Sequence, residues 1–154
     1  MNLEKYQQYS RIARGLEKAD LVLKDARIVN VFTEEIIRGD IAIQDGIIAG
    51  IGSFHGKEER DLAGRYVCPG FIDSHLHLES TLVTPAELVT VASRHGTTTF
   101  IVDPHESANV SGLAGIDYIL DQTEDVKANV YVMMPSCVPA TAIDDNGCTL
   151  TAED

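Results

Sequence analysis

Two hydrophobic patterns divide the chain near Cys68. Before it, short β-branched runs lie between turn residues, at 21–23, 27–32, 36–37, 40–43 and 47–51. Asp45-Gly46 between two such runs is a strong hairpin signal, and closely spaced strands of this kind predict a small β-sandwich or partial barrel. After it, apolar strands alternate with stretches of helical spacing: strands at 67–73, 97–103 and 129–134, helices at 84–95 and 113–123. That alternation predicts parallel βαβ units.

Capping residues define the ends of the helix predicted at 84–95. Thr84 suits an N-cap, Pro85 suits the first helical position, and Gly96 suits the end of the same helix. Residues 1–19 mix charges with apolar residues at helical spacing, which predicts a peripheral helix that ends near Gly15 or Lys18. The chain is therefore divided into three segments: an N-terminal helix at 1–19, a β-sandwich at 20–68 and βα units at 69–154.

Composition limits the classes of function. The chain has 154 residues, of which 44% are hydrophobic and 23% charged, as in globular proteins. Its net charge of −12 argues against nucleic-acid or anionic-membrane partners. The first residues lack an apolar signal core, so we expect a cytoplasmic protein. Its three cysteines form no CxxC pair, so neither a cysteine zinc site nor a disulfide framework is expected.

The pair His75 and His77 carries the strongest chemical signal. Side chains at positions i and i+2 of a strand point to the same side, about 6.6 Å apart along the chain. Two imidazoles so placed can converge on one metal at distances of about 2.0–2.1 Å. The two-residue pattern alone is weak. Its position at the carboxyl end of a parallel strand, where α/β proteins carry their active sites, predicts a metal site.

Two carboxylates flank this pair. Asp73 lies deeper in the strand, where we expect it to accept a hydrogen bond from an imidazole N–H. Glu79 begins the following loop, where it either binds substrate or only orders the loop, and the sequence favours neither.

A second polar cluster, Asp103-Pro104-His105-Glu106, ends the neighbouring strand. Carboxylates suit a second divalent metal or proton transfer. One of His105 and Glu106 should point into the site, and the sequence does not say which. Asp103, His105 and Glu106 are thus candidates for a second metal or for the wall of the site.

These motifs resemble a known family. The run Pro69–His77 is very similar to the first-strand signature of the amidohydrolase superfamily, and Gly46–Gly52 resembles part of its N-terminal β-sandwich. Three further segments, His75–Pro85, Asp103–Val110 and Pro135–Thr141, resemble the adenine deaminases of that superfamily. The resemblance runs over nearly the whole chain. It implies an α/β fold, the N-terminal part of a (β/α)8 TIM-type barrel preceded by a small β-sandwich.

The resemblance also implies a function. It implies a hydrolase of purine metabolism whose small-molecule substrate is adenine, which is deaminated to hypoxanthine and ammonia by metal-bound hydroxide in a binuclear manganese or iron site. His75 and His77 would hold one metal, and the segment 103–106 would line the site or help to hold the second. Imidazole and carboxylate suit zinc as well, so the metal stays open. Homo-oligomerisation stays open too.

Length sets a limit on that interpretation. A (β/α)8 barrel needs about 250 residues, whereas 86 residues follow Cys68 (154 − 68). We therefore expect a fragment with three barrel strands that is inactive alone. The catalytic acid–base groups and the remaining metal ligands are expected beyond Asp154.

Other functions remain as alternatives. A dihydroorotase- or hydantoinase-like cyclic amidase, or an N-acetylglucosamine-6-phosphate deacetylase, is the nearest one, although the segment 103–106 argues against it by resemblance. A cytidine-deaminase-type site is excluded because no Pro-Cys-x-x-Cys follows His77-Leu-Glu79. A non-catalytic metal-binding or regulatory module is the alternative from another class.

Overall fold

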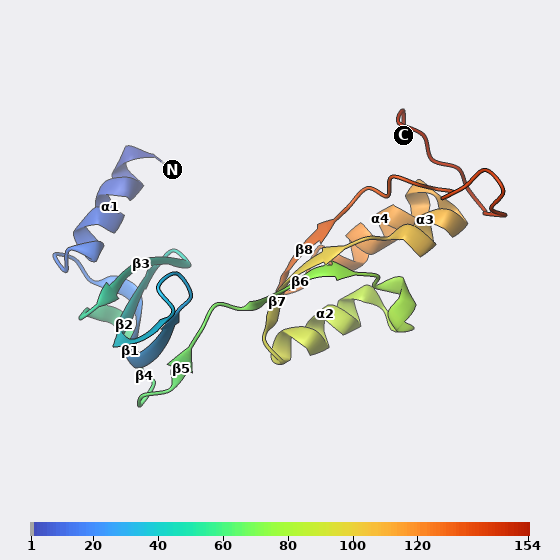
Figure 1. Cartoon of the computed structure of the whole chain (residues 1–154). Helices are drawn as coiled ribbons and strands as arrows, with labels where there is room; N and C mark the ends of the chain where they lie inside the picture. The colour runs from blue at the N-terminus through green and yellow to red at the C-terminus, as the bar shows by residue number, and fades with distance from the viewer. Residues whose placement is uncertain (1) are drawn as a thin grey trace. The chain divides into compact units, whose positions relative to one another are not determined.

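The computed structural model describes residues 2–154, which fall into two compact units that meet in sequence between Pro69 and Gly70 (Figure 1). The first unit contains one helix and five strands: α1 (Leu3–Ala13), β1 (Ala19–Asn30), β2 (Glu35–Gln44), β3 (Ile47–Gly52), β4 (Gly56–Asp61) and β5 (Tyr66–Val67). The strands form one sheet in the order β3-β2-β1-β4, with β5 also paired to β1. The predicted β-sandwich needs a second layer, and residues 2–69 supply only this sheet and α1.

The β2–β3 hairpin is the most accurately predicted feature of this unit. The two strands are antiparallel, and Asp45 and Gly46 at their turn have φ of 51° and 75°. A positive φ at both central residues is what a two-residue hairpin turn of type I′ requires. The helix prediction also agrees, because α1 ends at Ala13 and Gly15 follows with φ of 71°.

Two predicted breaks in the sheet are wrong. The run 21–23 and residues 27–30 of the run 27–32 belong to one strand, β1, whose register shifts between Leu23 and Ala26. Asp25 has φ of 51°, its N–H donates to Asp40, and its carboxylate accepts from Arg38. The polar residues Lys24 and Asp25 therefore form a β-bulge within the strand and not a turn. The runs 36–37 and 40–43 likewise merge into β2.

The second unit is built of parallel βα units, as the sequence predicted. Its elements are β6 (Phe71–Leu76), η1 (Glu79–Thr81), α2 (Pro85–Arg94), β7 (Thr97–Val102), α3 (His105–Ser111), α4 (Leu113–Thr123) and β8 (Asn129–Val132). The sheet order is β6-β7-β8 and both pairings are parallel. Thr84 caps α2 and Gly96 follows it with φ of 105°, so the predicted helix ends are confirmed.

One hydrophobic core joins the elements of this unit. Val89 of α2, Phe100 of β7 and Ile119 of α4 are buried in one cluster, together with Leu78 and Val102. Both helices therefore cover the same face of the sheet, and Figure 1 shows α2 and α4 along it. The side chains that alternate with these core residues, His75 among them, lie on the opposite face.

Two details of this unit differ from the prediction. The strand expected at 67–73 is interrupted: Val67 pairs with β1 in the first unit, whereas β6 begins at Phe71 and continues to Leu76. The helix α3 was not predicted, because five of its seven residues (His, Ser, Asn, Val and Ser) have low helix propensity and its N-cap position is Pro104, which makes no side-chain cap. No helix in residues 2–154 is long and apolar enough to cross a membrane.

Candidate metal centre

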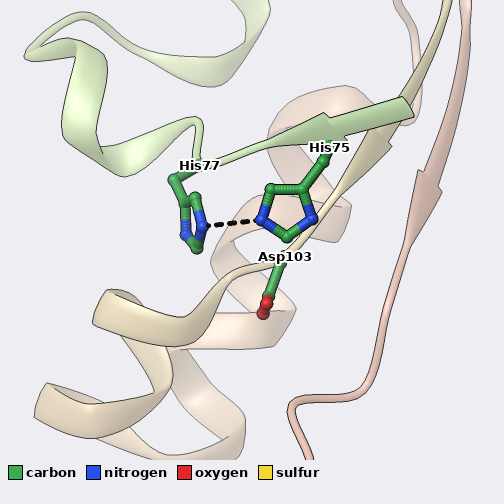
Figure 2. Close-up of side chains that lie close together, drawn as sticks. All are labelled: His75, His77 and Asp103. Atoms are coloured by element: carbon green, nitrogen blue, oxygen red, sulfur yellow. Dashed lines mark hydrogen bonds between the residues drawn. The ribbon is translucent and has the colours of Figure 1, made fainter. Parts of the chain in front are cut away.

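The sheet core fixes the direction of the two histidines. Leu76 and Leu78 pack against the cluster between sheet and helices, and Leu78 is fully buried. Because side chains alternate along a strand, His75 of β6 points away from that core, and His77, directly after β6, lies between Leu76 and Leu78 and leaves on the side of His75. Their Nε2 atoms lie 3.1 Å apart and their rings are inclined by 71° (Figure 2). The strand alternation thus brings both imidazoles to one point.

This arrangement fits a divalent metal. Two nitrogens that each lie about 2.0–2.1 Å from a tetrahedral ion are about 3.3 Å apart, close to the 3.1 Å between the two Nε2 atoms. Asp103, directly after β7, joins them: ligand atoms of these three residues all lie within 4.8 Å of one another (Figure 2).

Asp103 adds a second indication of a cation. Its Oδ1 is buried and has no hydrogen-bond partner among the described residues. A buried carboxylate oxygen without a partner is costly, and a metal ion is one of the groups that removes that cost. The donor set of two imidazoles and one carboxylate is therefore suited to a divalent transition metal.

The second nitrogen of His77 is held by Glu106. Its Nδ1 lies 2.8 Å from Oε2 of Glu106, and Ser80 Oγ donates to Oε1 of the same carboxylate at 2.9 Å. Burial alone would raise the pKa of Glu106, but hydrogen bonds, led by the one from Ser80, lower this pKa to about 2. Glu106 is thus ionised at neutral pH, and a carboxylate at Nδ1 leaves Nε2 of His77 free to bind a metal.

Glu79 lies on the other side of Glu106. Its Oε1 accepts hydrogen bonds from the backbone N–H groups of Glu106, at 3.0 Å, and Ser107, at 3.2 Å. Burial raises the pKa of Glu79, and the Glu106 carboxylate adds to that rise, although the backbone hydrogen bonds oppose it. His77, Glu79 and Glu106 form a second group of ligand atoms within 4.8 Å of one another.

The structure separates the other predicted site residues. Of His105 and Glu106, it is Glu106 that contacts His77, whereas His105 belongs to neither group of metal-ligand atoms in residues 2–154. Asp73 accepts from the backbone N–H of His75 at 3.3 Å and not from an imidazole, because its short side chain folds back along its own strand. Sequence reasoning missed Ser80, whose only signal is a hydroxyl beside Glu79.

Comparison with known proteins gives close relatives over almost the whole chain. It is 56% identical over 153 residues to the adenine deaminase of Desulfitobacterium hafniense, covering 99% of this chain and 27% of that protein. It is 53% identical over 142 residues to the adenine deaminase of Clostridium acetobutylicum, covering 92% of this chain and 25% of the relative. The chain thus spans about a quarter of the length of these curated relatives.

A solved structure supports the fold. The N-acyl-D-glutamate deacylase of Bordetella bronchiseptica, complexed with zinc and a phosphonate inhibitor, superposes with a TM-score of 0.55 and 24% sequence identity. The match covers 77% of this chain and 30% of that one. At this identity the likeness concerns the fold alone.

A family model covers the second unit and the end of the first. The model described as "Amidohydrolase family" matches residues 66–154, which is more than half of the chain. The resemblance drawn from Pro69–His77 and from the adenine-deaminase-like segments is therefore confirmed. The chain belongs to the amidohydrolase family.

Proposed function

We propose that the protein that carries this chain is a metal-dependent hydrolase that converts adenine to hypoxanthine and ammonia. Relatives named adenine deaminase, about 50% identical to nearly the whole chain, support the substrate. The observation that carries the metal dependence is the 3.1 Å approach of the two imidazole Nε2 atoms beside the unpartnered Asp103 oxygen. The activity is proposed for the whole protein, because the chain matches a quarter of its relatives' length.

The proposed architecture follows the fold of the second unit. The parallel order β6-β7-β8, with α2 and α4 on one face, is what the first three strands of a (β/α)8 barrel would present. We propose barrel units at 69–154, preceded by a helix at 1–19 and by a β-sandwich at 20–68. On this proposal the second sandwich layer and the remaining barrel strands come from outside the chain described here.

The proposed roles follow the contacts of the candidate centre. His75, His77 and Asp103 hold one divalent metal, which when bound supplies a Lewis acid that lowers the pKa of water toward 7. Glu106 holds the imidazole of His77 through Nδ1, and Ser80 holds Glu106. In the reaction water adds to C6 of adenine. The bond between C6 and the exocyclic nitrogen then breaks, which gives hypoxanthine and ammonia.

The number and identity of the metals are further parts of the proposal. Manganese, iron and zinc all suit these donors. Both candidate ligand groups use His77, and its Nδ1 is engaged by Glu106. We therefore propose that the second metal of a binuclear site takes most of its ligands from outside residues 2–154. The acid–base groups would come from there too, which is why this chain alone is expected to be inactive.

Ammonia release from adenine by the protein expressed from its complete reading frame tests this function. We expect equal amounts of hypoxanthine and ammonia, and loss of both in a His75→Ala, His77→Ala double variant. His95→Ala is a matched control, because His95 is exposed at the end of α2. A protein that is inert on adenine but opens cyclic amides would show that the substrate is wrong. Full metal content in the double variant would show that the site is wrong.

A further inference from the structure

The helix α3 begins without a cap of its own. Its N-cap position is Pro104, whose side chain makes no capping hydrogen bond. The first N–H groups of a helix have no partner within the helix. Here Glu79, which is 27 residues earlier than Glu106, accepts from two of them, the N–H groups of Glu106 and Ser107. The side chain of Glu79 in η1 therefore accepts the hydrogen bonds that an N-cap side chain accepts in many helices.

The helix turn that Glu79 holds also carries the carboxylate that holds His77. Glu106 is bound at its backbone N–H by Glu79 and at its side chain by Ser80 and the Nδ1 of His77. Four hydrogen bonds thus join residues 77–80 to the start of α3. Glu79 thus contacts Glu106, and Glu106 in turn contacts the imidazole of His77.

We propose that Glu79 is a positioning residue: it fixes the first turn of α3, and with it the Glu106 carboxylate that turns Nε2 of His77 toward His75. This inference rests on the proposed metal site. The sequence left two roles open for Glu79, substrate binding and ordering of the loop. The positioning role differs from both, because Glu79 acts on the metal site through Glu106 and His77.

Oε1 of Glu79 caps the helix, whereas its Oε2 is buried without a hydrogen-bond partner among residues 2–154, so substitution is what distinguishes this role from that of a metal ligand. Both hydrogen bonds reach one oxygen, Oε1, and both donors are backbone N–H groups. An amide oxygen accepts such bonds as a carboxylate oxygen does, so Gln preserves the cap. Asp keeps the charge but is shorter by one carbon–carbon bond, about 1.5 Å, and does not reach the helix. A ligand role requires the reverse order, since metal ions prefer a carboxylate to an amide.

The test is the zinc affinity of Glu79→Gln and Glu79→Asp in the protein expressed from its complete reading frame, measured by competition with a chromophoric chelator. His75→Ala defines the zinc that depends on the site. Glu124→Ala is the charge control, because Glu124 is exposed beyond the end of α4. We expect Glu79→Gln and Glu124→Ala to bind as the unsubstituted protein does. We expect Glu79→Asp to bind about ten- to a hundredfold more weakly, the usual effect of losing an outer partner of a metal-binding histidine.

Each other outcome overturns the inference. Weak binding by Glu79→Gln shows that the carboxylate itself is needed, as in a metal ligand. Normal binding by both variants shows that the contact to α3 does not position His77. Thermal unfolding of the metal-free variants shows that each one is folded. If no zinc depends on His75 even in the unsubstituted protein, the proposed function falls as well, so the two failures are distinguishable.

Discussion

Nδ1 of His77 lies 2.8 Å from a carboxylate oxygen of Glu106, so one imidazole is held at one nitrogen and presents the other to His75. Replacing Glu106 with Ala removes that partner and lets the ring turn. We predict about ten- to hundredfold weaker zinc binding, as for other outer partners of metal-binding histidines. Chelator competition measures it.

Glu106→Gln is the matched comparison for this prediction. The Gln amide oxygen still accepts from Nδ1, so we expect a smaller loss than in Glu106→Ala. Equal losses in the two variants would indicate that Glu106 binds a metal through its carboxylate. Ser80→Ala should weaken binding less than either, because Glu106 keeps its contact with His77 when the Ser80 hydroxyl is removed.

Zinc should stabilise the protein through Asp103. A ligand present at about one hundred times its Kd stabilises the folded state by about 2.7 kcal/mol. We predict a rise in Tm on adding zinc, and a much smaller rise in Asp103→Asn, because an amide replaces the buried carboxylate oxygen that has no other partner among residues 2–154. His95→Ala should show the full rise. A full rise in Asp103→Asn would exclude Asp103 as a ligand.

The ends of α2 could be predicted from sequence and those of α3 could not, for a physical reason. Thr84, Pro85 and Gly96 act within one turn of the helix that they bound, so their signal is local. The start of α3 depends on Glu79, which is distant in sequence and arrives only when η1 folds beside it. The bulge at Asp25 is similar, because Arg38 and Asp40 of the next strand hold it.

The candidate site divides in the same way. His75 and His77 could be predicted as a pair because strand alternation fixes which residues share a side. The choice of Glu106 over His105 could not, since it depends on how α3 leaves β7 after Pro104. The contact between Ser80 and Glu106 is a loop-to-helix contact with no periodic signal.

Loss of one partner of a buried ion pair should destabilise the first unit. Asp40 is 8% exposed and accepts from Lys24 Nζ and from the N–H groups of Asp25 and Phe54. We predict that Asp40→Asn lowers the free energy of unfolding by about 2–4 kcal/mol, because Lys24 keeps a partly buried charge without its partner. Urea unfolding measures this. Glu58→Gln, in an exposed pair with Arg60, should cause no measurable change.

The same carboxylate should make stability depend on pH in acid. Burial alone would raise the pKa of Asp40, but its hydrogen bonds, led by that from Lys24, hold this pKa below its ordinary value of 3.8. A carboxyl whose pKa is lower in the folded state contributes stability that is present above its unfolded pKa and is lost as pH falls through the folded value. The difference in free energy of unfolding between the unsubstituted protein and Asp40→Asn should therefore be constant from about pH 7 to about pH 5 and shrink below about pH 4. Urea titrations of both proteins at each pH measure it. A difference that already shrinks near neutral pH would show that another group controls it, and one that persists unchanged into strong acid would show that the Asp40 charge contributes nothing.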